Sequence, residues 1–282
     1  MHMGVRIITD STSDISAAQA KDLKVTVIPL KVIFGDKEYK EGVDISIEGF
    51  YDKLVKSEKL PTTSQPSPDE FLTSFLEAKE AKESVIVLLI AGKLSGTLQS
   101  AMIAKGLAEY EDIHIIDSQT TIMGLRFLVE HAVKLSGEGM SAKDIVSHLE
   151  ELKERIVLLA MVDTLEYLHK GGRLSRSSAI LGSLLKFKPI IQVKDGVIHV
   201  VGKERGTNKA ITKVLELIKE FGDIDDHYPV YFGYTAEDSK AKQLMESVKQ
   251  SFALTETSLH PVGCVVGTHA GPGACVITYI RK

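Results

Sequence analysis

The chain has 282 residues, of which 44% are hydrophobic and 26% charged, and this profile excludes an intrinsically disordered protein. Its net charge of -4 and pI near 6.2 give no support to a nucleic-acid-binding protein. The N-terminus lacks the layout of a signal peptide, and no apolar run reaches the ~18 residues that span a bilayer, so we expect a cytoplasmic protein without stable membrane insertion.

The first half of the chain alternates predicted strands with predicted helices. The apolar run over 84–90 is typical of a strand buried on both faces, and Pro29 interrupts the strand pattern over 25–34. The other expected strands are 5–9 and 113–117, and the expected helices are 15–23, 47–57, one opening at 67–70, 95–110, 120–136 and 142–155. This alternation predicts a Rossmann-like three-layer α/β/α domain with a largely parallel sheet. The glycine pattern of dinucleotide-binding sites is absent, so no nucleotide cofactor is expected.

The second half has a different pattern of predicted elements. Asp195-Gly196 separates two apolar runs and predicts a hairpin with a type I′ turn. The remaining expected elements are helices over 208–221 and 239–252 and strands over 230–234 and 275–280. Hairpin pairing mixed with helices is typical of a smaller α+β sandwich domain. We therefore predict two domains, residues 1–160 and 161–282, with Gly171-Gly172 in a loop on the hinge side.

Ser95 lies where an apolar strand, a turn and a predicted helix meet. Gly92-Lys93-Leu94-Ser95-Gly96 is one residue too long for the G-x-S-x-G turn of serine hydrolases. The hydroxyl could instead cap the helix. A helix N-terminus also offers unpaired N–H groups and a partial positive charge to an anion. Three interpretations therefore stay open: a helix cap, an anion clamp and a nucleophile.

Three further stretches could serve the same anion. Thr62-Thr63-Ser64-Gln65 places hydroxyls and an amide in a loop bounded by prolines, although such residues are also common in turns. Arg173 follows Gly171-Gly172 and offers a planar fork for a carboxylate or phosphate, or is a surface arginine after a helix. His269 stands in a glycine-rich loop before the last strand and could donate to an anion or transfer a proton, or be structural.

No metal site is predicted. Asp10 and Asp14 follow the first strand at the sheet edge where ligands gather, but no further acid joins them, so we expect Ser13 or Asp14 to cap the next helix. Cys264 and Cys275 stand among apolar residues without a histidine cluster. They are expected to be reduced core thiols and not a disulfide or zinc site.

Five stretches together resemble the DegV family: IITDSTSD, TTSQPSP, SGTLQSA, GGRLS and GTHAGPGA, in this order over essentially the whole chain. The resemblance implies a long-chain fatty acid, such as palmitate, held in a buried tunnel between two domains. It implies that Thr62, Thr63, Ser95 and Gly96 hold the carboxylate, with Arg173 and His269 at the same end. It also implies a partner, an ATP-dependent fatty acid kinase of phospholipid metabolism, which makes an acyl phosphate and docks near Lys203 and Arg205.

Three hypotheses follow. The first is a non-enzymatic carrier, which needs no cofactor and presents the fatty acid carboxylate to the kinase. The second is a serine hydrolase or esterase with Ser95 as nucleophile and His269 as base, although the 260–275 loop contains no acid to orient the imidazole. The third is a DNA-binding regulator, against which the acidic charge and the missing helix-turn-helix pattern argue. Many apolar residues could line the tunnel, and the stretches 123–129 and 179–185 are two candidates.

Overall fold

A computed structural model of the protein describes residues 4–174 and 186–282. The first half forms a parallel sheet between two helical layers, as predicted. Its strands are β1 (Val5–Asp10), β2 (Val25–Ile28), β6 (Ser84–Leu89) and β7 (Ile113–Asp117), and its helices are α1 (Ala17–Leu23), α3 (Pro68–Ala81), α4 (Thr97–Ala108), α5 (Ile122–Gly137) and α6 (Ala142–Lys153). The strand order is β2-β1-β6-β7, and each neighbouring pair is parallel.

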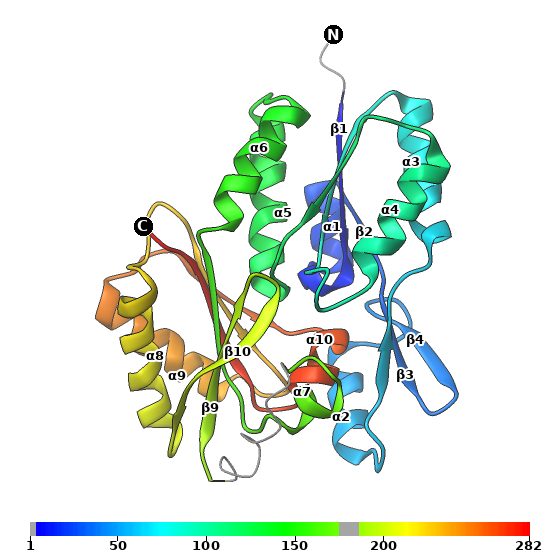
Figure 1. Ribbon diagram of the computed structural model, residues 1–282. Helices are drawn as coiled ribbons and strands as arrows, with labels where there is room; N and C mark the ends of the chain where they lie inside the picture. Colours follow the sequence, from blue (N-terminus) through cyan, green and yellow to red (C-terminus); the bar gives the residue numbers. More distant parts are fainter. Residues whose placement is uncertain (1–3, 175–185) are drawn as a thin grey trace.

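Strand β6 shows why its sequence is continuously apolar. Its alternate residues Val85, Val87 and Leu89 pack in the cluster that α3 and α4 cover. Ile86 and Leu88 pack in the cluster that α5 and α6 cover on the other face. The two helical layers stand on opposite sides of the sheet (Figure 1). The prediction of a strand buried on both faces is therefore confirmed.

The second half is built on a mixed six-stranded sheet. Its elements are β8 (Ile156–Met161), α7 (Glu166–Lys170), β9 (Lys188–Lys194), β10 (Val197–Glu204), α8 (Thr207–Phe221), β11 (Val230–Tyr234), α9 (Ser239–Phe252), β12 (Thr257–Pro261), α10 (Cys264–Ala270) and β13 (Cys275–Ile280). The order is β10-β9-β8-β13-β11-β12, antiparallel except for the pair β11 and β12. Helices α8 and α9 cover one face (Figure 1).

The predicted hairpin is confirmed at its turn. Asp195 and Gly196 join β9 to β10 with φ of 51° and 70°, the left-handed conformation at both central positions that a type I′ turn requires. The mixed sheet already begins at Ile156 in β8, a few residues before the predicted boundary. The division into residues 1–160 and 161–282 stays a prediction.

A third, small sheet was not predicted. It consists of β3 (Lys31–Phe34), β4 (Lys37–Lys40) and β5 (Thr62–Ser64), in the order β4-β3-β5, and α2 (Ile47–Lys56) packs against it. Pro29 separates β2 from β3, which belong to different sheets, because proline cannot donate to a continuing ladder. Strands β3 and β5 of the small sheet contact helix α10.

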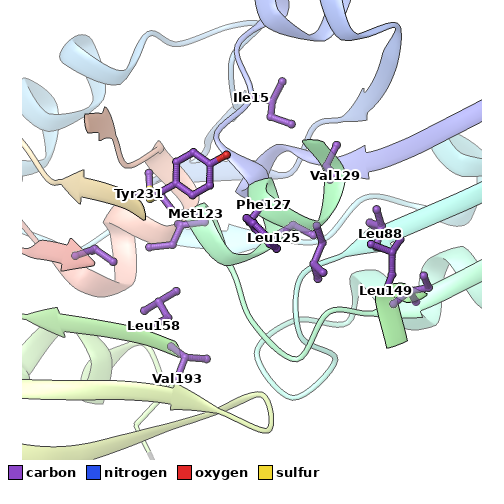
Figure 2. Packing of buried hydrophobic residues seen from close by; sticks show 14 of the residues in the cluster. Ile15, Leu88, Met123, Leu125, Phe127, Val129, Leu149, Leu158, Val193 and Tyr231 are labelled. Atoms are coloured by element: carbon purple, nitrogen blue, oxygen red, sulfur yellow. The ribbon is translucent and has the colours of Figure 1, made fainter. Parts of the chain in front are cut away.

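One large hydrophobic cluster joins the parallel sheet to the mixed sheet through α5. Figure 2 shows Leu88 on the parallel-sheet side, Leu158 and Val193 on the mixed-sheet side, and Met123 and Leu125 of α5 between them. Residues from both halves of the chain are thus buried together, and the two sheets are held by apolar contact. Among the described residues, no helix combines the length and the apolar content that a membrane crossing needs.

Three predicted helix starts, at residues 15, 95 and 120, lie two residues before the observed starts. Helix α1 begins after Ser16, whose side chain accepts a hydrogen bond from the N–H of Gln19, so neither Ser13 nor Asp14 caps it. Instead, Ser11–Ser13 form a short 3-10 turn, which ends at Asp14 with a φ of 54°. Helix α4 begins at Thr97, and Gly96 rather than Ser95 occupies its N-cap position.

Candidate functional site

A cavity of about 260 Å³ lies between the parallel sheet and the mixed sheet. Leu30, Ile90 and Thr121 line it from the segments that follow β2, β6 and β7. It therefore lies at the carboxyl ends of the parallel strands, where open α/β sheets bind their ligands. Strands β5, β8, β9, β10 and β13 and helices α7 and α10 also contribute to the wall.

The mixed sheet gives the cavity an apolar floor. Ala160 in β8 lies opposite Val276 of β13 and Ile191 of β9, and Leu158 lies opposite Val193. All five side chains line the cavity, because alternate residues of neighbouring strands point to the same face. The small side chain of Ala160 at the centre of this face leaves space that a larger residue would fill. Such a wall can take a flexible hydrocarbon chain but offers it no polar partner.

Polar side chains meet in one part of the wall. Ser95, Thr63, Arg173 and His269 all line the cavity, although they come from four separate segments. The Ser95 hydroxyl lies 2.8 Å from the hydroxyl oxygen of Thr97 and 3.4 Å from the Thr97 amide nitrogen, at the first turn of α4. Hydroxyl groups beside a helix N-terminus can donate hydrogen bonds to an anion. The structure thus brings these four predicted residues together.

His269 is not the exposed loop residue that its glycine-rich surroundings suggested. It is in the last turn of α10, largely buried, and its Nε2 atom lies 2.9 Å from the hydroxyl oxygen of Thr63 in β5. Burial, and secondarily the neighbouring positive Arg173, lower the pKa of the His269 imidazole to about 4. The ring is therefore neutral near pH 7 and can donate only one N–H. Arg173 supplies the positive charge at this end of the cavity.

Arg173 is held by main-chain carbonyls. Its Nε donates to the carbonyl oxygen of Leu94 at 3.1 Å, and its Nη1 donates to that of Gly171 at 2.7 Å. The first of these bonds ties the guanidinium to the turn that carries Ser95. Partial burial lowers the pKa of Arg173 from its usual value, and the side chain stays charged at neutral pH. A fixed cation beside neutral donors is a suitable environment for a carboxylate.

Gly171 has no side chain because His269 occupies the space. Its backbone conformation, φ -76° and ψ -6°, is open to any residue. A Cβ at this position, however, would lie 2.2 Å from Nδ1 of His269 and 3.0 Å from the Tyr167 carbonyl oxygen. The glycine is thus required by the close approach of α10 to α7.

We expect Gly171→Ala to push the imidazole away from Thr63 and to weaken binding of an anion in the cavity about tenfold, the effect of one lost hydrogen bond. Displacement of a fluorescent fatty acid by oleate measures this affinity. Gly106→Ala is the matched control, because a Cβ at Gly106 in α4 has nothing within 4 Å. Equal affinities for the two variants would refute the packing role of Gly171.

The other predicted residues lie outside the cavity wall. Thr62 is exposed, one residue before Thr63 on β5, so the two side chains point to opposite faces. A Cβ on Gly96 would collide with the Gln65 side chain, whose Nε2 donates to the Ser100 hydroxyl at 3.2 Å. This contact links two of the sequence motifs. The carboxylate-binding role of Thr62 and Gly96 stays a prediction.

The structure describes one of the two stretches that were candidates for lining the lipid tail. Residues 123–129 pack in the large hydrophobic cluster and do not line the cavity, whose wall takes only the neighbouring Thr121 and Ile122 from the start of α5. Their contribution to a lipid tunnel stays a prediction. The stretch 179–185 lies outside the described residues.

Buried carboxylates at the sheet edge are the feature that the sequence patterns missed. Asp10 accepts hydrogen bonds from the Thr12 amide and hydroxyl and from the Ile90 amide, at 2.9, 2.6 and 2.8 Å. Asp14 and Glu41 accept from main-chain amides at the start of α10. Burial raises the pKa of Asp10 to about 6 and that of Glu41 to about 7. The position of Asp10 and Asp14 after an apolar strand was a weak sequence signal for buried acids. No local sequence pattern marks Glu41 as buried.

The chain is similar to known proteins over its whole length. A family model described as "Uncharacterised protein, DegV family" matches residues 4–282. A DegV domain-containing protein of Caldanaerobacter subterraneus is 36% identical over 278 residues, which cover 99% of each protein. A DegV family protein from Thermus thermophilus, described by its fatty acid binding, has a TM-score of 0.91 at 31% identity and covers 99% of this chain and 100% of its own. A stearic acid-binding protein from Eubacterium ventriosum has a TM-score of 0.90 at 31% identity, with 99% of this chain and 98% of that one covered.

Proposed function

The chain belongs to the DegV family, and from this premise we propose that it binds a long-chain fatty acid in the cavity between its two large sheets. We further propose that it presents the carboxylate to a separate ATP-dependent fatty acid kinase, which transfers a phosphoryl group to a carboxylate oxygen and releases ADP. The observation that carries the proposal is the meeting of an apolar cavity with one polar end built from Thr63, Ser95, Arg173 and His269.

The apolar wall supports a hydrocarbon ligand. Each buried methylene contributes about 0.8 kcal/mol, so a sixteen-carbon tail contributes on the order of 10 kcal/mol before the cost of ordering it. Val193, Ile198 and Val276 line the cavity without polar side-chain atoms. A ligand held in this way is expected to stay bound through purification.

The polar end supports a carboxylate. A buried carboxylate needs hydrogen-bond donors or a positive charge, because its desolvation is otherwise prohibitive. The hydroxyls of Ser95 and Thr63, the neutral imidazole of His269 and the guanidinium of Arg173 are the groups available in this wall. Arg173 adds a positive charge to these donors, which favours a carboxylate over a neutral ester.

Ser95→Ala tests the carboxylate clamp. We expect the affinity for oleate to fall about tenfold or more, since a hydrogen bond to a charged group contributes about 1.5–3 kcal/mol. The affinity for oleyl alcohol, which lacks the charge, is expected to change about twofold or less. Displacement of a fluorescent fatty acid measures both. Equal losses for the acid and the alcohol would show that Ser95 does not contact the carboxylate.

The hydrolase alternative finds less support in the geometry. The Ser95 hydroxyl is hydrogen-bonded to the Thr97 hydroxyl. Nε2 of His269 is hydrogen-bonded to the Thr63 hydroxyl. Buried Nδ1 of His269 has no hydrogen-bond partner among the described residues, so no acid orients the ring there. A fluorophosphonate probe separates the two functions, because a nucleophilic Ser95 would form an adduct that mass spectrometry locates. We expect none.

The exposed end of β10 is the proposed docking site for the kinase. Lys203 and Arg205 are exposed, and their charges lie 5.4 and 5.0 Å from the ring centre of Phe187. An aromatic ring flanked by two cations suits an acidic partner surface.

Charge reversal tests this docking site. We expect Lys203→Glu with Arg205→Glu to lower kinase-dependent ADP release about tenfold or more and to change oleate affinity less than twofold, because both residues lie outside the cavity wall. Lys209→Glu with Lys219→Glu, two exposed positions on α8, makes the same change in net charge. Equal losses of ADP release in the two double variants would point to overall charge and contradict a specific site.

A further inference from the structure

Helix α10 carries His269, the histidine of the proposed carboxylate end, in its last turn. The start of the helix is held by two acids, Asp14 and Glu41, which lie outside the cavity. Val265, Val266, His269 and Ala270 of this helix line the cavity. At its start, the Gly263 amide donates to Asp14 Oδ1 at 3.0 Å and the Val265 amide donates to Glu41 Oε1 at 2.8 Å. The first amides of a helix have no partner within the helix, so these carboxylates satisfy two groups that would otherwise be unpaired.

The two carboxylates crowd one backbone position. A Cβ on Gly263 would lie 2.5 Å from Glu41 Oε1 and 2.6 Å from Asp14 Oδ1. Glu41 Oε2 also accepts a hydrogen bond from the Ser11 hydroxyl at 2.6 Å, and Ser11 Oγ accepts one from the Leu30 amide at 3.0 Å. The start of α10 is therefore fixed to the segments that follow β1 and β2.

The surroundings of the two carboxylates favour their protonated forms more than water does. Burial raises the pKa of Glu41 to about 7, and burial followed by the charge on Glu41 raises the pKa of Asp14. The other ionisable groups around them are Asp10 from β1, Tyr51 from α2, Cys264 from α10 and Arg126 from α5. Arg126 is buried, and its Nη1 donates to the main-chain oxygen of Asp14 at 3.2 Å. A glutamine amide keeps a carbonyl acceptor, and it differs less in charge from Glu41 than from an exposed glutamate.

We infer that Asp14 and Glu41 are positioning residues for His269: they anchor the start of α10 and so place the imidazole at its other end against Thr63. The inference rests on the proposed function for the identity of the ligand. The placement of His269 by the two acids does not depend on that function. Neither acid touches the ligand site, because neither lines the cavity. Their effect on binding must pass through the helix. At Gly267 the helix packs on Tyr51 of α2, and at His269 it packs on Gly171, which follows α7.

Substitution of Glu41 tests the inference. Glu41→Ala removes the acceptor for the Val265 amide, whereas Glu41→Gln keeps a carbonyl oxygen at the same reach. Glu38→Ala on the neighbouring β4 is the matched control, since its carboxylate is 56% exposed and pairs only with Lys31 among the described residues. Two quantities are measured on protein stripped of lipid: the ¹⁵N signals of the His269 ring by NMR, and the affinity for oleate.

We expect Glu41→Ala to shift the His269 ring signals and to weaken oleate binding about tenfold. Glu41→Gln is expected to restore both to near the wild-type values, and Glu38→Ala to leave both unchanged. A lower unfolding temperature for Glu41→Ala with unchanged His269 signals and unchanged affinity would show a merely structural role and overturn the inference.

Two further outcomes also decide between the inference and its failure. If Glu41→Ala does not fold, Glu41→Asp replaces it, because the shorter side chain withdraws the carboxylate from the Val265 amide; unchanged His269 signals in that variant would overturn the inference. If the wild type takes up no oleate, the proposed function fails, while the His269 signals of the variants still decide the positioning role.

Discussion

An Ala160→Phe variant is expected to purify without fatty acid and to bind added oleate about a hundredfold more weakly than the wild type. Ala160 lies at the centre of the apolar face, between Val276 of β13 and Ile191 of β9. A phenyl ring there enters the cavity and takes the space of several methylenes. Exclusion of four methylenes costs about 3 kcal/mol, which corresponds to about a hundredfold in the dissociation constant.

The fold is expected to survive this change, because the ring occupies a cavity that already exists and displaces little packed structure. Circular dichroism and the unfolding temperature check this point. Ala18→Phe, on the exposed surface of α1, is the matched control for adding a large apolar side chain. Wild-type oleate affinity in folded Ala160→Phe would show that the tail is held elsewhere.

Asp10→Ala is expected to give the largest loss of stability. The carboxylate is fully buried and accepts three hydrogen bonds, from the Thr12 amide, the Thr12 hydroxyl and the Ile90 amide. Its removal leaves three buried donors without this acceptor at the edge of the sheet, where each unpaired group costs about 1–3 kcal/mol. We expect a total of about 3–5 kcal/mol, or a fall of roughly 6–12 °C in the unfolding temperature.

Asp112→Ala is the control for this prediction. Asp112 lies just before β7, at the opposite end of the same sheet, where it accepts a hydrogen bond from the Ser84 hydroxyl and its side chain is 29% exposed. Its removal is expected to cost about 1 kcal/mol. Thermal unfolding followed by circular dichroism compares the two variants, and similar falls in both would contradict the special role of Asp10.

Much of the fold could be predicted from local sequence. The apolar run over 84–90 and the Asp195-Gly196 turn each carry their structural cause within a few residues, namely burial on two faces and a left-handed backbone at two positions. The small sheet could not be predicted in the same way. Its strand β4 has the sequence Lys-Glu-Tyr-Lys, which shows no apolar alternation, and it forms because β3 offers it an edge.

The site shows the same division between local and distant causes. The residues Thr63, Ser95, Arg173 and His269 were identified as candidates from their types and neighbours, and all four line one cavity. Helix α10 was misread as a loop because its glycines suggested backbone freedom. Gly267 instead serves packing, since a Cβ there would lie 2.4 Å from the Tyr51 hydroxyl oxygen. Glu41 pairs with an amide 224 residues away, a contact that no local pattern encodes.

The most direct test of the central claim is denaturing extraction of the purified protein followed by mass spectrometry of the released small lipids. The proposed function predicts close to one long-chain fatty acid per chain, as the buried tail and the polar end near Arg173 and His269 require. A protein that releases no fatty acid and takes up neither added palmitate nor added oleate would contradict it. The same cavity would then have to be assigned to another ligand.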